Sequence, residues 1–188
     1  MLSGVQVGHG VARNPCGPGV HFQIVKPYGI EVGGTPLQVR INQGEVQHQL
    51  GEWRGVEAKY NEDRDNLDWR VRARAHFTVG VLDALVSTLG SYSCCWLVCQ
   101  ADGGSILGLM RYYITEGVYV AIGLLAINPI HLADTPGSCQ LRGVGTSLVA
   151  AVSRQALAAH VDEITLHPLD SQARRFWTGR GFRDVDGT

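Results

Sequence analysis

The sequence predicts a mixed α/β fold in which helices cover both faces of one mostly antiparallel sheet. Three strand-like runs, at 94–100, 105–114 and 118–127, follow one another across short glycine-containing turns, a pattern typical of an antiparallel meander. Two helical patterns precede this meander, and a helix, a strand and a second helix follow it. Because the run at 118–127 is apolar on both faces, we expect it in the middle of the sheet.

The elements before the meander begin with short strands. "HFQIV" and "GIEV" lie between glycine turns, and "PLQVRINQ" alternates apolar and polar residues. The segment 44–60 predicts an amphipathic helix, because apolar residues recur in it at steps of three and four, namely Val46, Leu50, Trp53, Val56 and Tyr60. A second helix is expected to run from an N-cap at Asp65 or Asn66 to Gly90.

The elements after the meander are a helix over 143–159, a strand within 161–169, a short helix within 171–181 and the start of a last strand at "FRDV". No internal repeat and no second core is visible in the 188 residues. We therefore expect one domain, residues 36–188, preceded by a glycine- and proline-rich extension with short strands, residues 1–35.

Composition and charge exclude several classes of protein. The net charge of −1 offers no general attraction to nucleic acid or to an anionic membrane. No segment has the pattern of a secretory signal or of a membrane span. The five cysteines have neither the pairing of a disulfide framework nor the spacing of a metal site. We therefore expect a protein of a reducing compartment without a metal ion, located in the cytoplasm or translocated into a host cytoplasm.

Two glycines lie at the start of the helix predicted over 143–159, in the stretch "QLRGVG" (140–145). The first N–H groups of a helix have no intrahelical partner, and glycine lets a ligand approach the backbone, so the stretch predicts an anion site that suits phosphate. A Walker A loop is excluded because its lysine is missing, and a dinucleotide-binding fingerprint is excluded because Leu148 stands where a third glycine is needed. Tight packing at the helix entry remains an alternative explanation of the two glycines.

Three segments carry a resemblance to a known family. "QLRGVG", between "LLAINP" and an amphipathic helix, resembles the acetyl-CoA pyrophosphate loop (Gln-x-x-Gly-x-Gly) of the GCN5-related N-acetyltransferases, the GNAT family. "DSQARRFWTGRGF" is similar to the family's Asn–Ala–aromatic–Gly-Phe segment, and "WLVCQADGGSILGLMRYYI" is similar to its second and third strands. The resemblance covers about residues 95–183. It implies a GNAT fold and an acetyl-CoA-dependent N-acetyltransferase that acts on a primary amine.

The resemblance also implies where acetyl-CoA binds. The strand at 118–127 would splay from its neighbour, so that its free backbone groups pair with the pantetheine arm, and the glycine loop would hold the pyrophosphate. The residues that the resemblance places at the cofactor are Leu125, Ala126, Ile127, Gln140, Leu141, Arg142, Gly143, Val144, Gly145, Thr146, Asp170, Ser171, Arg174 and Trp177.

The sequence departs from the family at both usual proton carriers. Trp177 stands where the family has a tyrosine acid, and an indole N–H does not deliver a proton at a useful pKa. Ala121 stands where some members have a glutamate base. Candidate substitutes are Tyr113 (or its neighbour Tyr112), Tyr119, His131 and Asp134, although ordinary packing or a solvated loop also explains each of them.

Two functions therefore remain open. The first is acetyl transfer to a primary amine of a protein or of a polar small molecule. The second is a CoA-binding regulatory or interaction protein with weak or no turnover, which includes a toxin or secreted effector. The scarcity of lysine, which supplies two of the sixteen basic residues, suits an effector that avoids modification, and it equally suits a genome rich in arginine codons.

The acceptor side is expected near residues 52–74, where six acidic and six basic residues lie. In the GNAT family this helical region borders the acceptor groove, and mixed charge there fits a peptide or polar amine; a solvated helix face is the alternative. The chain stops just past the start of its last strand, so the family's C-terminal strand region is expected to be truncated. An N-terminal strand or the second subunit of a homodimer would then cover the open sheet edge.

Overall fold

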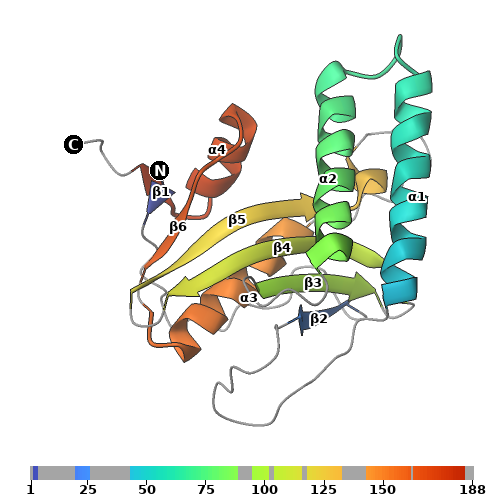
Figure 1. Cartoon of the computed structure of the whole chain (residues 1–188). Coiled ribbons are helices and arrows are strands. Elements are labelled where there is room, and N and C mark those ends of the chain that lie inside the picture. Colours follow the sequence, from blue (N-terminus) through green and yellow to red (C-terminus); the bar gives the residue numbers. More distant parts are fainter. Residues whose placement is uncertain are drawn as a thin grey trace.

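The fold is built around one β-sheet. The computed structural model describes residues 2–3, 20–25, 43–88, 95–101, 104–115, 118–132, 143–161 and 163–184. The strands are β1 (Leu2–Ser3), β2 (Val20–Val25), β3 (Cys95–Ala101), β4 (Ile106–Thr115), β5 (Tyr119–Ile127), β6 (Ile164–Leu166) and β7 (Arg183–Asp184). Over the described residues they form a seven-stranded sheet in the order β2-β3-β4-β5-β6-β1-β7. The helices are α1 (Gln43–Glu62), α2 (Trp69–Thr88), α3 (Val144–Ala158), α4 (Ser171–Thr178) and the short 3-10 helix η1 (Pro129–His131) (Figure 1).

The strands β3, β4 and β5 form the predicted antiparallel meander, and β2 pairs antiparallel with β3 at its other side. On its other side β5 pairs in parallel with β6, so the prediction that this strand lies inside the sheet is confirmed. Both faces of β5 contact helices. Ile122 belongs to the hydrophobic cluster on the α3 side, and Ala126 belongs to the cluster on the α1 and α2 side. That double contact explains why the strand is apolar throughout.

Helices cover both faces of the sheet, as the sequence predicts (Figure 1). On one face Leu148 of α3 lies in a hydrophobic cluster with Met110 of β4. On the other face Trp53 of α1 and Leu82 of α2 lie in a second cluster with Leu109 of β4. Neighbouring residues of a strand point to opposite faces, so residues 109 and 110 serve the two cores separately.

The apolar stripe predicted for the first long helix is confirmed. Val46, Leu50, Trp53 and Tyr60 are all buried along α1. The Tyr60 hydroxyl donates a hydrogen bond to the carbonyl oxygen of Pro129 at 2.9 Å. Because η1 follows β5 directly, this bond fixes the end of β5 against α1.

The second long helix begins later than the sequence predicts. Its N-cap is Asp68, whose carboxylate accepts the N–H of Arg70 at 2.9 Å, and the helix starts at Trp69. The predicted cap, Asn66, instead donates its side-chain amide to Asp63 at 2.7 Å within a turn. Four Asp or Asn side chains compete in this stretch, and the turn that Asp63 and Asn66 form leaves Asp68 to cap α2.

An N-terminal strand does lie beside β6. β1 pairs antiparallel with β6 on one side and with β7 on the other, in the registers Leu2↔Leu166 and Leu2↔Asp184. The strand predicted within 161–169 is shorter than expected, because only Ile164–Leu166 is paired. The predicted strand "GIEV", and all but the last residue of "PLQVRINQ", lie outside the described residues, so the division of the chain at residue 35 stays a prediction.

Candidate cofactor and acceptor site

The sheet opens between β5 and β6. Their parallel pairing begins at Val120↔Ile164 and ends at Ile122↔Leu166, but β5 continues to Ile127. From this point β5 pairs only with β4, because the chain after β6 turns away toward α4. The backbone groups along the β6 side of the last part of β5 therefore have no strand partner among the described residues. The predicted separation of these two strands is present.

A β-bulge marks the place where the strands separate. Arg111 of β4 pairs with Leu124 and Tyr112 pairs with Ile122, so Gly123 is an extra residue on β5. A bulge bends a strand and re-aims its neighbours. Here it bends β5 immediately after its last residue paired to β6, which explains why the two strands part at this point.

The N-terminus of α3 presents unpaired backbone donors. Gly143 is the N-cap, with a φ of 94° and no side-chain cap, and its carbonyl oxygen accepts the N–H of Ser147 at 2.8 Å. The N–H groups of Val144, Gly145 and Thr146 therefore have no intrahelical acceptor, and the helix dipole adds a partial positive charge there. The residues predicted at the start of this loop, Gln140, Leu141 and Arg142, lie outside the described part of the chain.

Gly145 lies in a closely packed place. A Cβ at this position would lie 3.0 Å from the Phe176 ring and 3.6 Å from Cδ1 of Ile127. The first turn of α3 is thus held against α4 and against the end of β5. Tight packing therefore accounts for Gly145, and the anion site stays a prediction.

Arg180 is a residue of the candidate anion site that was not predicted from the sequence. Its guanidinium donates to Oγ1 of Thr146 and to the carbonyl oxygen of Phe176, and it lies 3.5 Å above the Phe176 ring. Burial lowers the pKa of Arg180, and its Nε is buried without an acceptor in the described structure. No carboxylate pairs with Arg180 within the described ranges. A positive charge without a counter-ion therefore stands beside the α3 N-terminus. The only sequence signal was an arginine between the two glycines of "GRG".

The predicted residues on the α4 side have separate places. Ser171 lies at the first position of α4, and Arg174 forms an ion pair with Asp184 of β7 at 2.9 Å. Trp177 is 6% exposed and packs edge-on against Phe182 in the α3-side core. The roles of these three residues at the cofactor stay predictions.

Asp170 joins α4 to α2. Its carboxylate accepts the N–H of Ala173 at 2.6 Å, which caps α4, and it accepts Nη2 of Arg74 at 2.9 and 3.1 Å. The Ala173 N–H lowers the pKa of Asp170 most and Arg74 lowers it further, while partial desolvation acts in the opposite direction. Asp170 is therefore an anchor between two helices in addition to its predicted place at the cofactor.

The depressed pKa of Asp170 predicts how stability depends on pH. A carboxyl with a lowered folded-state pKa stabilises the fold above its ordinary value of 3.8, and this contribution is lost as the pH falls through the folded-state pKa. We expect Asp170→Asn to have a lower thermal midpoint than the wild type at neutral pH. Thermal unfolding from pH 7 to pH 2 should show that the difference in thermal midpoint between the two proteins becomes smaller below pH 3.8. A difference that stays constant down to pH 2 would contradict this assignment.

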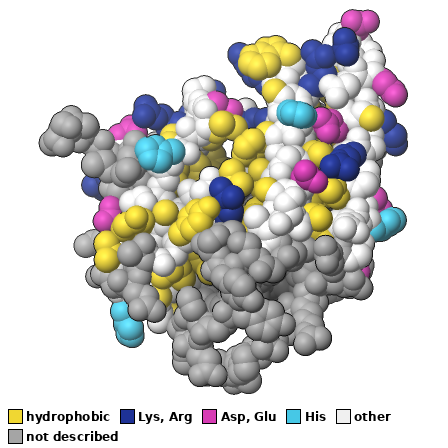
Figure 2. Space-filling view, viewed as in Figure 1, with side chains coloured by type: hydrophobic (Ala, Val, Ile, Leu, Met, Phe, Trp, Pro, Cys, Tyr) yellow, Lys and Arg dark blue, Asp and Glu magenta, His cyan; other side chains and the backbone are white. Residues whose placement is uncertain are grey.

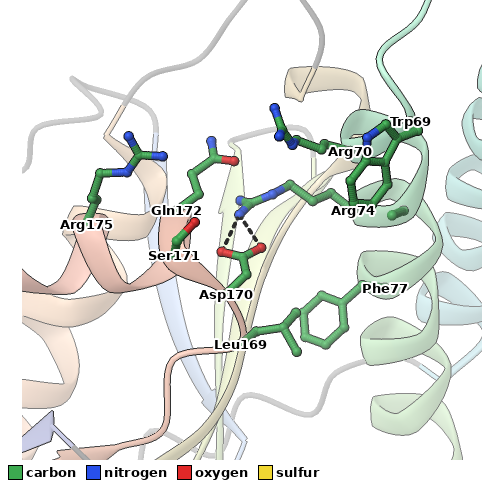
Figure 3. A pocket seen from close by; sticks show the side chains of 10 residues that line it. Trp69, Arg70, Arg74, Phe77, Leu169, Asp170, Ser171, Gln172 and Arg175 are labelled. Carbon is green, nitrogen blue, oxygen red and sulfur yellow. Dashed lines mark hydrogen bonds and ion pairs between the residues drawn. The ribbon is translucent and has the colours of Figure 1, made fainter.

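A pocket of about 390 Å³ lies between α2 and the start of α4. Residues of α2 form one wall and residues of 169–175 form the other, and Arg74 and Asp170 meet across it (Figure 3). Hydrophobic side chains are exposed in the hollow between these two helices (Figure 2). One wall of the pocket belongs to α2, which packs on β5, and the other wall, residues 169–175, follows β6 in the chain.

The structure distinguishes among the four candidate proton carriers. Tyr113 points to the α1 and α2 face, where its ring lies 3.2 Å from the Cβ position of Gly123 at the bulge. Its neighbour Tyr112 is fully buried on the α3 side, and burial raises the pKa of its hydroxyl. Tyr119 is 38% exposed at the start of β5, and His131 lies in η1 beyond the other end of that strand. Asp134 lies outside the described residues.

Within the same described ranges, no group of three or more His, Cys, Asp or Glu side chains is placed to hold a metal ion. Of the cysteines described, Cys95 is half-buried and Cys99 is buried. None of the described helices is long and apolar enough to cross a membrane.

Comparison with known proteins finds similarity to solved structures alone. No protein-family model and no curated protein matches the sequence. The fold is similar to ribosomal-protein-alanine N-acetyltransferase from Brucella melitensis biovar Abortus 2308, with a TM-score of 0.50 and 11% identity over 90% of this chain and 94% of that one. A GCN5-related N-acetyltransferase from Ralstonia eutropha JMP134 matches with a TM-score of 0.48 and 14% identity, over 90% of this chain and 96% of that chain.

A third similar structure is the acetyltransferase AAC(6')-Iy in complex with a bisubstrate analogue, CoA-S-monomethyl-acetylneamine, with a TM-score of 0.46 and 16% identity over 89% of this chain and 95% of that one. These likenesses concern the fold. The chain has the fold of the GCN5-related N-acetyltransferases.

Proposed function

We propose that this protein binds acetyl-CoA and transfers its acetyl group to a primary amine. The observation that carries the proposal is the opening between β5 and β6. It lies next to the N-terminus of α3, where Arg180 donates a hydrogen bond to Thr146. A strand edge without a partner suits an amide-containing arm, and backbone N–H groups with a buried arginine suit a pyrophosphate. The two features lie together because Ile127 and Gly145 are in contact range.

The described residues fit the cofactor. Leu125, Ala126 and Ile127 would pair with the pantetheine arm along the free side of β5, and the α3 amides at 144–146 would hold the pyrophosphate. Arg180 supplies a positive charge beside these amides, in addition to Arg142, which the family resemblance places at the cofactor. Gly145 lets the first turn of α3 pack closely against Phe176 and Ile127 at the end of β5.

The chemistry requires little more than positioning and proton handling. Acetyl-CoA brings an activated thioester; a bond forms from the amine nitrogen to the acetyl carbon as the carbon–sulfur bond breaks. The amine loses a proton, and the thiolate leaves with one. Among the candidates Tyr113 is best placed to donate that proton, because it lies beside the bulge where the strands part.

Tyr113→Phe tests this assignment. We expect kcat to fall by ~100-fold, in the range of a lost general acid, while the affinity for acetyl-CoA stays the same. Tyr119→Phe is the competing variant, because Tyr119 was predicted on the same grounds but lies at the far end of β5. If Tyr119→Phe lost activity and Tyr113→Phe did not, the assignment would be wrong.

Calorimetric titration with acetyl-CoA, with ATP and NAD as controls, tests the proposed function itself. We expect micromolar binding of acetyl-CoA alone, followed by release of free thiol when a panel of primary amines is added. Absence of acetyl-CoA binding would refute the proposal.

Arg180→Ala tests the anion site. We expect the affinity for acetyl-CoA to fall by roughly 10- to 100-fold, the loss typical of one hydrogen-bonded charge. Arg154→Ala is the matched control, because Arg154 is an exposed arginine of α3 away from its N-terminus. Thermal unfolding of both variants checks that Arg180→Ala still folds, since Arg180 also joins α3 to α4. Unchanged affinity in a folded Arg180→Ala protein would exclude Arg180 from the site.

A second function, binding of CoA with weak or no turnover, is favoured by one observation. Trp177 occupies the place of the family's tyrosine acid, and its side chain is packed in the core. Binding of acetyl-CoA without thiol release for any amine would select this function over acetyl transfer.

A further inference from the structure

The lining of the pocket between α2 and α4 carries more positive than negative side chains. Three arginines, Arg70, Arg74 and Arg175, line it together with one carboxylate, Asp170. Asp170 is paired with Arg74 at 2.9 Å. Arg70 has only a 3.8 Å contact with Asp68, which does not line the pocket. No carboxylate of the described residues pairs with Arg175. The Arg175 guanidinium is therefore available to an anion, and Arg70 is held only by an ion pair outside the pocket.

The same pocket also exposes apolar surface. Phe77 and Leu169 face each other below the Arg74–Asp170 pair, from the two walls of the pocket (Figure 3). Leu169 is 67% exposed, and Trp69 at the rim is 64% exposed. Large apolar side chains exposed next to a cavity are typical of a ligand site. A volume of about 390 Å³ is at the small end of such sites, so the occupant is a small molecule.

The position of the pocket connects it to the reaction. Leu169 and Asp170 follow β6 directly, and the opposite wall belongs to α2, which packs on β5. The two walls of the pocket are thus attached to the two strands that border the opening. If acetyl-CoA occupies that opening, as proposed above, the pocket is where an acceptor approaches it.

We propose that the acceptor, on the basis of the proposed acetyl transfer, is a small primary amine that carries a carboxylate and an apolar side chain. Arg175 and Arg70 bind the carboxylate, since a guanidinium matches a carboxylate with two parallel hydrogen bonds. Leu169 and Phe77 contact the apolar part. An amine with several ammonium groups is disfavoured, because each added positive charge is repelled by the net positive charge of the pocket.

Phenylalanine and phenylalaninamide are the matched pair of probes. They differ only in the carboxylate, and the amide has the less basic amine, so intrinsic reactivity at neutral pH favours the amide. We expect kcat/KM, measured by thiol release from acetyl-CoA, to be at least ~10-fold higher for phenylalanine than for its amide, the effect of one charged contact. Spermidine, a polyamine without a carboxylate, is expected to be a poorer acceptor than either.

Arg175→Gln identifies the contact. We expect this variant to raise the KM for phenylalanine by at least ~10-fold and to leave the KM for phenylalaninamide unchanged. Arg154→Gln, an exposed arginine on α3, is the control and is expected to change neither value. The side chain of Arg175 is exposed, so its replacement is not expected to unfold the protein.

Calorimetric titration of the protein with phenylalanine and with its amide separates this inference from the proposed function. Binding of phenylalanine, weakened in Arg175→Gln, supports the pocket even if no acetyl group is transferred, and in that case only the proposed function fails. Thiol release that is as fast with phenylalaninamide or spermidine as with phenylalanine overturns the inference while acetyl transfer stands. A preference for phenylalanine that persists in Arg175→Gln overturns it as well.

Discussion

Replacement of Gly143 by valine is expected to abolish acetyl-CoA binding. Gly143 has a φ of 94°, in a region that a β-branched residue adopts only with strain of roughly 1–3 kcal/mol. If the backbone of residue 143 rotates to relieve that strain, the first turn of α3 changes its orientation. The N–H groups of residues 144–146 then no longer point at one anion. We expect the dissociation constant, measured by calorimetry, to rise by roughly 100-fold or more.

Gly80→Val is the matched control for this substitution. Gly80 lies on the exposed side of α2, and a Cβ there meets no atom within 4 Å. Valine at this position is expected to change the free energy of unfolding by less than about 0.5 kcal/mol and to leave acetyl-CoA binding intact. If Gly143→Val bound acetyl-CoA as tightly as Gly80→Val, the α3 N-terminus would not be the pyrophosphate site.

Replacement of Gly108 by valine is expected to be the most destabilising single change at the site. A Cβ on Gly108 would lie 2.7 Å from Cγ1 of Val144 and 2.9 Å from the carbonyl oxygen of Ala126. The second contact is with backbone inside a paired strand, so it cannot move aside cheaply. We expect the free energy of unfolding, measured in urea, to fall by about 3 kcal/mol. Because Val144 begins α3, acetyl-CoA binding should weaken as well.

Gly55→Ala provides the contrast for stability. Gly55 lies inside α1 with no atom within 4 Å of its Cβ position, so alanine is expected to stabilise the protein by about 0.5–1 kcal/mol. If Gly108→Val unfolded at the same urea concentration as the wild type, α3 would not pack as closely on β4 as the structure shows.

Local periodicity was sufficient for most of the fold. The meander, the buried stripe of α1 and the glycine entry to α3 could all be predicted, because each depends on residues a few positions apart. The start of α2 could not be predicted, because Asp65, Asn66 and Asp68 are chemically equivalent caps and only the turn around Asp63 selects the last of them.

The candidate site was predicted in part for the same reason. The glycine loop and the free end of β5 follow from segments that are short in sequence. The separation of β5 from β6 follows from the family resemblance. Arg180, by contrast, meets Thr146 across 34 positions of sequence, and nothing local relates the two. Nor could the sequence relate Arg74 to Asp170, which are 96 positions apart.

The sequence by itself therefore determined the class of fold, predicted an anion site at the α3 entry and showed Trp177 where the GNAT family has a tyrosine. Only the tertiary structure decided which charges remain unpaired. Arg74 and Asp170 neutralise each other, whereas Arg175 and Arg180 keep their charge without a carboxylate partner among the described residues. The physical reason is that neutralisation depends on distances of a few ångströms between side chains, and folding, not sequence spacing, sets those distances.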